Sequence, residues 1–326
     1  MQTKIVYTLI SSNNDYYTEQ LLASAWSAKF YNANTEILLL CDESTKKYIG
    51  HKYGNIIWDV INEIKAIDVP IGLGLKERSR WLKTNAREYV SGAMIQVDTD
   101  TIICGELSEL DSLESDIAAV YDYHCPLACA PYKNTVFDNV CKLYDLSMDV
   151  VRKMEINYYN SGVIFSNDTE KARTFYRDWH KFWKVGIDKG MPRDQFAFFR
   201  AAMDNSVDRL DDVYNCMIRT SIRFLHTAKI MHFFNSGWGS DEISPFFSDE
   251  IYRRIKENGN IADSDKKRIL NCKSEFSSPS VIMDSYESEV VFSPVFILLR
   301  VWHNDKSIMF KFANYLSRAM LKLKGL

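Results

Sequence analysis

The 326-residue sequence lacks an excess of charge of either sign, a long apolar run and a recognisable leader. Its net charge of −3 gives no basic field of the kind that draws a protein to nucleic acid. No run reaches the roughly 18–20 apolar residues of a membrane-spanning helix. The opening MQTKIVYTLISSNNDYY has no charged lead followed by an unbroken apolar core. We therefore expect no nucleic-acid partner and a cytoplasmic location.

The seven cysteines form no regular framework. Their odd number and irregular spacing indicate free thiols in a reducing compartment. Cys125 and Cys129 lie four residues apart with His124 beside them, but structural zinc would need a second ligand pair at suitable spacing. No such pair stands out, and no G-x-x-x-x-G-K-S/T of a P-loop occurs. The sequence therefore disfavours both a zinc module and a P-loop nucleotide triphosphatase.

Apolar runs alternate with segments of helical periodicity along most of the chain. Continuous apolar strands of this kind are typical of a sheet covered by helices on both faces. The expected strands are residues 3–10, 36–42, 55–61, 93–98, 117–123 and 162–167. The expected helices are residues 18–32, 78–90, 169–186 and 192–203, the last with Pro192 near its first turn. The pattern predicts an α/β fold.

The alternation of apolar strands and helices becomes less regular after about residue 240. Two polar breaks, NGNIADSDKKR and SSPS, interrupt the apolar pattern there, and no internal repeat or low-complexity tract occurs. We expect a main domain over residues 1–250 and a helical C-terminal extension over residues 251–326.

The stretch AMIQVDTDTII (93–103) places two acids directly after a mostly apolar run. Buried charge is costly unless it is paired or bound to a metal. On an extended strand Asp98 and Asp100 point to the same face, about 6.8 Å apart. Without a cation, their repulsion would raise the pKa of one of them. Both could reach one Mg²⁺ or Mn²⁺, which binds oxygens at roughly 2.1 Å, if the chain bends at the strand end. The alternative to a metal site is that the two acids only cap a helix or form a turn after the strand.

A second Asp-x-Asp, Asp263-Ser264-Asp265, has no strand before it, and we expect it to be a solvated loop. Only Asp98 and Asp100 follow an apolar strand within the α/β pattern. Ligands of such sheets bind outside the carboxyl ends of the strands. The first pair is therefore the better candidate for a site.

Three further groups of polar residues accompany apolar segments. Asn160-Ser161-Gly162 comes immediately before an expected strand. Asp194 and Gln195 lie in the first turn of an expected helix, where the helix dipole favours acids. His232 lies within the apolar run AKIMHFF. It is either a core histidine or, with two carboxylates, the imidazole of a Mn²⁺ ligand set.

Taken in order, six segments resemble glycogenin and the bacterial lipopolysaccharide galactosyl- and glucosyltransferases, which are glycosyltransferase family 8-like proteins with a GT-A fold. The segments are NNDYY, ERSRWLK, QVDTDTII, YYNSGVIF, PRDQFAF and KIMHFF, within residues 3–240. The resemblance implies a GT-A catalytic domain over residues 1–250 with a mixed, mainly parallel central sheet. It also implies transfer of a hexose from a nucleoside-diphosphate sugar, UDP-hexose above all, to a saccharide or lipid-linked saccharide. The reaction would need Mn²⁺ or Mg²⁺ and would retain the anomeric configuration.

The same resemblance implies roles for individual residues. Asp98, Asp100 and His232 match the family's metal ligands. The predicted catalytic set, which lines the sugar pocket, is Asp194, Gln195 and Asn160. The predicted set for binding the nucleotide sugar and its metal is Thr8, Asp15, Tyr16, Tyr17, Arg80, Lys83, Asp98, Thr99 and Asp100. Within it, Asp15 and one of the two tyrosines would meet the nucleotide.

The sequence departs from the family after the histidine. The family carries a Lys-Pro-Trp segment there, whose lysine grips the diphosphate, whereas this chain reads HFFNSGWGSDE. Trp238 echoes the tryptophan, and Lys229 or Arg80 could replace the lysine. The missing lysine keeps open a catalytically inactive nucleotide-sugar-binding protein. A pyrophosphorylase-like nucleotidyltransferase is the other alternative, although SSNNDYY lacks the glycines of its phosphate loop and GLGLKER (72–78) lies too far along the chain.

Residues 306–326, KSIMFKFANYLSRAMLKLKGL, carry five basic residues and no acid. Apolar residues recur at helical spacing, namely Met309, Phe312, Leu316, Ala319 and Leu323. A basic amphipathic helix can lie in a membrane interface that contains anionic lipid. We therefore expect peripheral attachment to the cytoplasmic face of a membrane. A C-terminal helix that packs on the core with a solvated basic face is the alternative.

Overall fold

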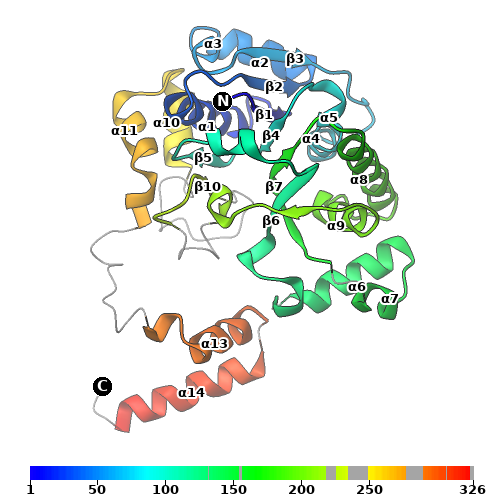
Figure 1. The fold of residues 1–326 in the computed structure, drawn as a ribbon. Coiled ribbons are helices and arrows are strands. Elements are labelled where there is room, and N and C mark those ends of the chain that lie inside the picture. The colour runs from blue at the N-terminus through cyan, green and yellow to red at the C-terminus, as the bar shows by residue number, and fades with distance from the viewer. Residues whose placement is uncertain are drawn as a thin grey trace.

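The computed structural model describes residues 1–130, 132–153, 156–217, 225–233, 249–276, 289–305 and 307–323. A seven-stranded sheet runs through its centre in the order β3-β2-β1-β4-β7-β6-β8 (Figure 1). Its strands are β1 (Lys4–Leu9), β2 (Ile37–Cys41), β3 (Glu63–Ala66), β4 (Met94–Val97), β6 (Ile117–Tyr121), β7 (Tyr159–Ser166) and β8 (Asp208–Arg209). A small sheet, β5-β10-β9, contains β5 (Thr101–Ile103), β9 (Cys216–Met217) and β10 (Ile230–His232).

The central sheet is mixed and mainly parallel. Strands β3, β2, β1 and β4 pair in parallel, and β7 pairs antiparallel with both β4 and β6. Helices cover both faces, as Figure 1 shows. The α/β fold with a mixed, mainly parallel sheet that the sequence led us to expect is therefore confirmed.

The helices account for much of the remaining described chain. The α-helices are α1 (Tyr17–Tyr31), α2 (Glu43–Tyr53), α3 (Ile57–Val60), α4 (Leu75–Thr84), α5 (Ala86–Tyr89), α6 (Lys133–Tyr144), α7 (Met148–Lys153), α8 (Glu170–Asp188), α9 (Asp194–Asp204), α10 (Glu250–Asn258), α11 (Asp263–Leu270), α13 (Pro294–Asn304) and α14 (Ile308–Leu323). The 3₁₀ helices are η1 (Ser108–Ser112), η2 (Asp122–His124), η3 (Leu127–Cys129), η4 (Asp212–Tyr214) and η6 (Cys272–Phe276).

One apolar core lies on each face of the sheet, because successive side chains of a strand point to opposite faces. On β1, Ile5 and Tyr7 belong to one buried cluster and Val6 belongs to the other. The first cluster includes residues of α1, α10 and α11, and the second includes residues of α4, α8 and α9. Strands β2, β4 and β7 are buried along their whole length. Burial on both faces explains why β2 reads as a continuous apolar run, ILLLC.

The strand predicted over residues 55–61 is wrong. Ile57–Val60 forms the short helix α3, and the third parallel strand, β3, follows it. Ile57 and Val60 are buried three residues apart on one side of the helix, whereas Trp58 is 59% exposed. Because β3 lies at the edge of the sheet and has no fully buried residue, its sequence lacks the apolar run expected of a strand.

Three element boundaries also differ from the prediction. The helix expected over residues 78–90 is two helices, α4 and α5, which meet at Asn85. Helix α9 begins at Asp194 with Arg193 as its N-cap, so Pro192 precedes the helix. Strand β7 begins at Tyr159, so the Asn-Ser-Gly motif lies within the strand and not before it.

The second Asp-x-Asp is not a solvated loop. It forms the first turn of α11, and the side chain of Asp265 is only 1% exposed. Asp265 Oδ1 accepts hydrogen bonds from Arg254 Nε at 2.9 Å and Nη2 at 2.5 Å. The charge is tolerated because a guanidinium on α10 compensates it. The sequence could not indicate a partner on another helix.

The C-terminal elements differ in how much of their surface they bury. Residues of α10 and α11 belong to the first apolar core, whereas no residue of α14 is buried. In Figure 1 the pair α13 and α14 stands apart from the sheet-containing body. In the described part of the chain, no helix has the length and apolarity to cross a bilayer. The domain boundary at residue 250 stays a prediction.

The two acids of the second Asp-x-Asp give a matched stability test. We expect Asp265→Ala to lower the free energy of unfolding by about 2 kcal/mol, because a charge-assisted hydrogen-bonded pair is lost. Asp263 is 89% exposed on the same helix turn, so Asp263→Ala should change it by less than about 0.5 kcal/mol. Urea unfolding followed by circular dichroism measures both. Equal effects would contradict the different burial of the two side chains.

Candidate active site

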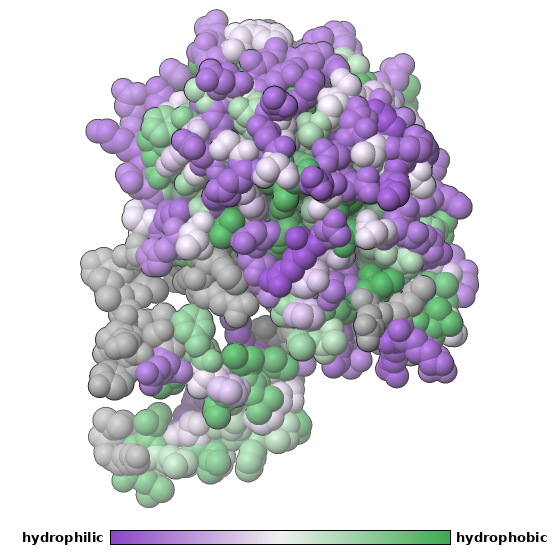
Figure 2. All heavy atoms as spheres, in the orientation of Figure 1, coloured by the Kyte–Doolittle hydropathy of each residue, from purple (hydrophilic) through white to green (hydrophobic). Residues whose placement is uncertain are grey.

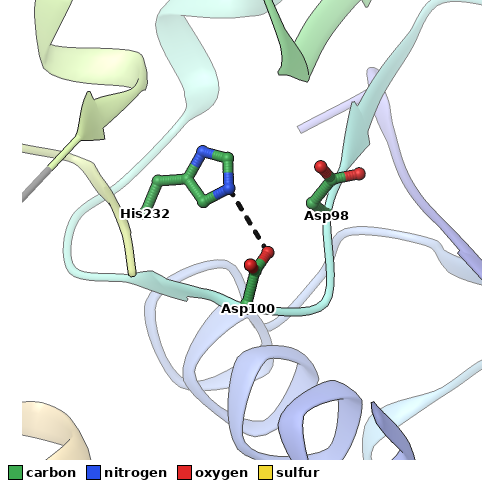
Figure 3. Close-up of side chains that lie close together, drawn as sticks. All are labelled: Asp98, Asp100 and His232. Carbon is green, nitrogen blue, oxygen red and sulfur yellow. Dashed lines mark ion pairs between the residues drawn. The ribbon is translucent and has the colours of Figure 1, made fainter. Parts of the chain in front are cut away.

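The turn between β4 and β5 carries the first Asp-x-Asp to the carboxyl end of the central strand. Asp98, Asp100 and His232 converge there, with ligand atoms that all lie within 4.8 Å of one another (Figure 3). His232 Nε2 lies 3.3 Å from Asp100 Oδ1. The histidine reaches the turn because β10 pairs antiparallel with β5, which sets His232 opposite Thr101. Within the described residues this is the one group of three or more such side chains suited to holding a metal ion.

Main-chain hydrogen bonds fix this turn from two sides. Asp98 N–H donates to the carbonyl of Gly162 on β7 at 2.8 Å, and Phe233 N–H donates to the carbonyl of Asp100 at 2.9 Å. Thr101 Oγ1 donates to the carbonyl of Asp98 at 2.8 Å. The two carboxylates therefore project from a backbone that both sheets constrain.

A buried lysine joins the acids of the turn to the first turn of α9. Lys83 Nζ lies 2.8 Å from Asp98 Oδ1 and 3.3 Å from Asp194 Oδ2, and the lysine side chain is only 3% exposed. Burial of an ammonium group at this depth is tolerated because two carboxylates compensate it. Lys83 thus links the candidate metal ligands to the predicted sugar pocket.

Asp194 is held as a permanent carboxylate. Arg80 Nε lies 2.9 Å from its Oδ1, and Ser161 Oγ donates to its Oδ2 at 3.0 Å. Burial raises the pKa of Asp194, but the charges of Lys83 and Arg80 and the hydrogen bond from Ser161 outweigh it and lower the pKa to about 2. Asp194 therefore cannot act as a proton donor near neutral pH. It can accept hydrogen bonds and stabilise positive charge.

Asn160 and Gln195 meet around a buried acid that we did not predict from the sequence, Asp122. Asn160 Nδ2 donates to Asp122 Oδ1 at 3.0 Å. Burial raises the pKa of Asp122, although hydrogen bonds from Asn160, Tyr132 and Gln195 oppose the shift. Asp122 follows the apolar strand β6, which is the same pattern that drew attention to Asp98.

A cleft of about 450 Å³ opens beside the turn. Its volume falls within the usual range for small-molecule sites. Of the residues predicted to bind the nucleotide sugar and its metal, all except Tyr16 line this cleft, namely Thr8, Asp15, Tyr17, Arg80, Lys83, Asp98, Thr99 and Asp100. The predicted donor residues, which are scattered over the first 100 positions, thus share one concavity.

The structure distinguishes the two tyrosines after β1. Tyr17 lines the cleft and is 39% exposed. Tyr16 packs against the first apolar core, and Lys256 Nζ on α10 lies 4.9 Å from the centre of its ring. Lys256 Nζ also donates to the carbonyl of Asp15 at 2.5 Å. Only Tyr17 is therefore available to a base bound in the cleft.

The carboxylate of Asp15 shapes the loop in which it lies. It accepts hydrogen bonds from Ser11 Oγ at 2.6 Å, Ser12 N at 2.9 Å and Tyr17 N at 3.1 Å. These bonds lie within the segment between β1 and α1 and fix its shape. A direct contact of Asp15 with a nucleotide stays a prediction.

The two lysine substitutes named from the sequence have different surroundings. Lys229 Nζ pairs with Glu109 Oε2 at 2.6 Å and is not among the residues that line the cleft, whereas Arg80 lines it. Trp238 lies outside the described residues. Arg80 is therefore the better candidate for contact with a phosphate.

The charge of Asp194 gives a pH-dependent test. We expect Asp194→Asn to lower the free energy of unfolding at pH 7 by roughly 2 kcal/mol, because the low pKa measures how strongly the fold favours the carboxylate. A lowered pKa stabilises the fold above the unfolded-state value of 3.8, and the contribution is lost as the pH falls through about 2. The difference between wild type and variant should therefore stay constant from about pH 8 to 5 and shrink below about pH 4.

Urea unfolding across this pH range measures the difference, with Asp204→Asn as the control. Asp204 lies at the other end of α9, where its side chain is 46% exposed. A difference that changes between pH 8 and 5 would contradict the permanent ionisation of Asp194.

Comparison with known proteins shows a likeness in structure. No family model and no curated protein sequence matches the chain. A crystal structure of the galactosyltransferase LgtC in complex with donor and acceptor sugar analogs matches with a TM-score of 0.51 and 13% identity, covering 82% of this chain and 100% of that one. An active-site mutant of LgtC matches with a TM-score of 0.53 and 14% identity, covering 81% and 100%. At such low identity the likeness establishes the fold, and the chain therefore has the GT-A fold of these glycosyltransferases.

Proposed function

We propose that the protein is a metal-dependent glycosyltransferase. It transfers a hexose from a nucleoside-diphosphate sugar, UDP-hexose above all, to a saccharide or lipid-linked saccharide. The observation that carries the proposal is the convergence of Asp98, Asp100 and His232 at the edge of the cleft that the predicted donor residues line. The GT-A fold supports the proposal, because the two solved structures matched above are the galactosyltransferase LgtC and its active-site mutant.

The three side chains fit a small divalent cation. Two carboxylates and one imidazole form a ligand set that suits Mn²⁺. Mg²⁺ prefers oxygen ligands and could bind the two carboxylates. In a neutral imidazole, a His232 Nε2 that carries a lone pair would face the Asp100 carboxylate oxygen at 3.3 Å. Two acceptor atoms at this distance repel each other unless a cation lies between them. A bound divalent ion would supply Lewis-acid stabilisation of the charge on the departing nucleoside diphosphate.

The protein's own residues provide the remaining electrostatics. Arg80, whose side chain is 41% exposed, extends from α4 into the cleft and presents a cation to the donor. Asp194 accepts hydrogen bonds from sugar hydroxyls and stabilises positive charge that develops at the anomeric carbon. We assign to Asn160 and Gln195, which meet at Asp122, the role of orienting the sugar. Tyr17 offers its ring to the uracil.

The acceptor attacks from the face on which the diphosphate leaves, with retention of configuration. This part of the proposal rests on the resemblance to the glycogenin and lipopolysaccharide transferase family. Asp194 is an unsuitable proton donor because its pKa is about 2. The role we assign to it is therefore electrostatic.

We assign the C-terminal helices to a membrane surface. Over Ile308–Leu323, helix α14 exposes large apolar side chains and carries Lys311, Arg318 and Lys322 without an acid. Hydrophobic residues gather over α13 and α14 in Figure 2. Exposed apolar residues with cations are the combination that binds an interface containing anionic lipid. An acceptor linked to lipid on the cytoplasmic leaflet would then lie within reach of the enzyme.

The sequence departure after His232 favours one second candidate. Because HFFNSGWGSDE contains no lysine, a nucleotide-sugar-binding protein without catalysis is the alternative function. Release of free hexose from the donor in the presence of Mn²⁺ separates the two, since an active transferase passes some sugar to water. The pyrophosphorylase-like alternative is disfavoured, because SSNNDYY lacks the glycines of its phosphate loop.

The metal proposal predicts the effect of removing either acid. Asp98→Ala and Asp100→Ala should each lower turnover with UDP-hexose at least 100-fold, or about 2.7 kcal/mol of transition-state stabilisation. Asp263→Ala removes an exposed acid from the other Asp-x-Asp and serves as the control. Turnover is measured during Mn²⁺ titration after chelation. Wild-type turnover in both variants would contradict metal dependence.

Donor binding predicts a rise in apparent stability. A nucleotide sugar at about 100 times its dissociation constant should stabilise the folded state by about 2.7 kcal/mol. A thermal-shift screen of nucleotide sugars with and without Mn²⁺ measures the effect and identifies the donor. The shift should depend on Mn²⁺ and should be lost in Asp100→Ala. No shift with any nucleotide sugar would contradict both the transferase and the binding protein.

The membrane proposal predicts dependence on charge. Replacing Lys311, Arg318 and Lys322 by Glu should abolish co-sedimentation with vesicles containing anionic lipid, because the attraction becomes repulsion. Lys311→Arg together with Lys322→Arg keeps the charge and should bind as wild type does. Sedimentation of the glutamate variant at the wild-type level would contradict membrane attachment through α14.

A further inference from the structure

Gly162 lies directly against the imidazole of His232. A Cβ added at this position would lie 2.2 Å from His232 Cε1 and 2.8 Å from Nδ1. Contacts below 3.0 Å cannot persist between these atoms, so any side chain at residue 162 would displace the histidine ring. His232 is 2% exposed, which leaves the ring little space to move aside. Glycine is therefore required by the neighbouring ring.

The same glycine also contacts the other side of the candidate metal site. Its carbonyl accepts the hydrogen bond from Asp98 N–H at 2.8 Å. A shift of β7 away from the histidine would therefore disturb the turn that carries Asp98. Gly162 thus determines how closely His232 and the Asp-x-Asp turn approach each other.

A chain of hydrogen bonds determines which nitrogen of His232 carries the proton. Gly162 N–H donates to Asn160 Oδ1 at 2.9 Å. Because a main-chain N–H can only donate, this bond fixes the orientation of the Asn160 amide. Asn215 Nδ2 donates to the same Asn160 Oδ1 at 2.9 Å, which fixes the orientation of the second amide in turn.

The remaining oxygen of Asn215 can only accept. Asn215 Oδ1 lies 3.0 Å from His232 Nδ1, so Nδ1 carries the proton. In the neutral ring, Nε2 then keeps its lone pair and faces Asp100. Asn215 and His232 are both buried, so water does not compete for this bond. The tautomer is the one in which Nε2 can bind a metal ion.

We propose that Gly162 and Asn215 are positioning residues for His232 as a metal ligand. Gly162 sets the position of the ring, and Asn215 sets its tautomer. The proposal rests on the metal site of the proposed function. Partners that orient a histidine ligand in this way commonly affect metal affinity about 10–100-fold when they are replaced.

Mn²⁺ affinity, measured by titration calorimetry without donor or acceptor, tests the proposal. We expect Gly162→Ala and Asn215→Leu to weaken Mn²⁺ binding by about 10–100-fold. Gly105→Ala is the matched control, because the atom nearest to its Cβ would be Lys229 Cγ at 3.4 Å, an ordinary contact distance. Circular dichroism verifies that each variant is folded.

Nitrogen NMR of the histidine ring in the wild-type protein tests the tautomer without any variant or metal. At a pH where the imidazole is neutral, we expect the proton on Nδ1 of His232. A proton on Nε2 would overturn the role of Asn215, whether or not the variants fold. His232→Ala identifies the His232 resonances.

The outcomes separate the two levels of the proposal. If the wild-type protein binds no Mn²⁺, the metal site of the proposed function is wrong, and the NMR measurement still decides the tautomer. If wild type binds and the folded Gly162→Ala variant binds equally well, the positioning role of Gly162 is wrong and the metal site stands. If the folded Asn215→Leu variant binds Mn²⁺ as wild type does, the positioning role of Asn215 is wrong.

Discussion

The site depends on one buried ammonium group. Lys83 Nζ lies between Asp98 at the end of β4 and Asp194 at the start of α9, and it is nearly inaccessible to water. Without it, two carboxylates would share a partly desolvated space with Asp100 close by, and their repulsion would oppose the approach of α9 to the turn. Because Lys83 neutralises part of this charge, the turn after β4 and the start of α9 can lie side by side.

Much of the fold and of the site could be predicted because the relevant features are local in sequence. An apolar run predicts a buried strand. An acid that follows the run, such as Asp98, marks the end of that strand. The helix dipole makes an acid at a helix start, such as Asp194, equally recognisable. The order of such segments added the resemblance that connected His232 to Asp98 and Asp100, and the structure brings these three side chains together.

The features that we did not predict depend on partners distant in sequence. The local sequence around Asp265 predicts a loop, and only the structure shows its ion pair with Arg254. Asn215 lies in no motif, and its importance follows only from its contacts with His232 and Asn160. The sequence predicts a strand where helix α3 lies, because Ile57 and Val60 would be apolar and buried in either structure. For Asp265 and Asn215 the deciding feature is a contact between residues far apart in the sequence, which a local sequence pattern does not contain.

The bond between Lys256 and the loop after β1 has a consequence for biosynthesis. It joins the carbonyl of Asp15 to a lysine 241 positions later in the chain. Contacts of such long range form late, because the entropy of closing the intervening chain must be overcome first. A nascent chain that emerges from the ribosome can complete the sheet strands near its start well before α10 is available to cover Tyr16. The wall of the cleft at Asp15 and Tyr17 is therefore among the last parts of the chain to mature.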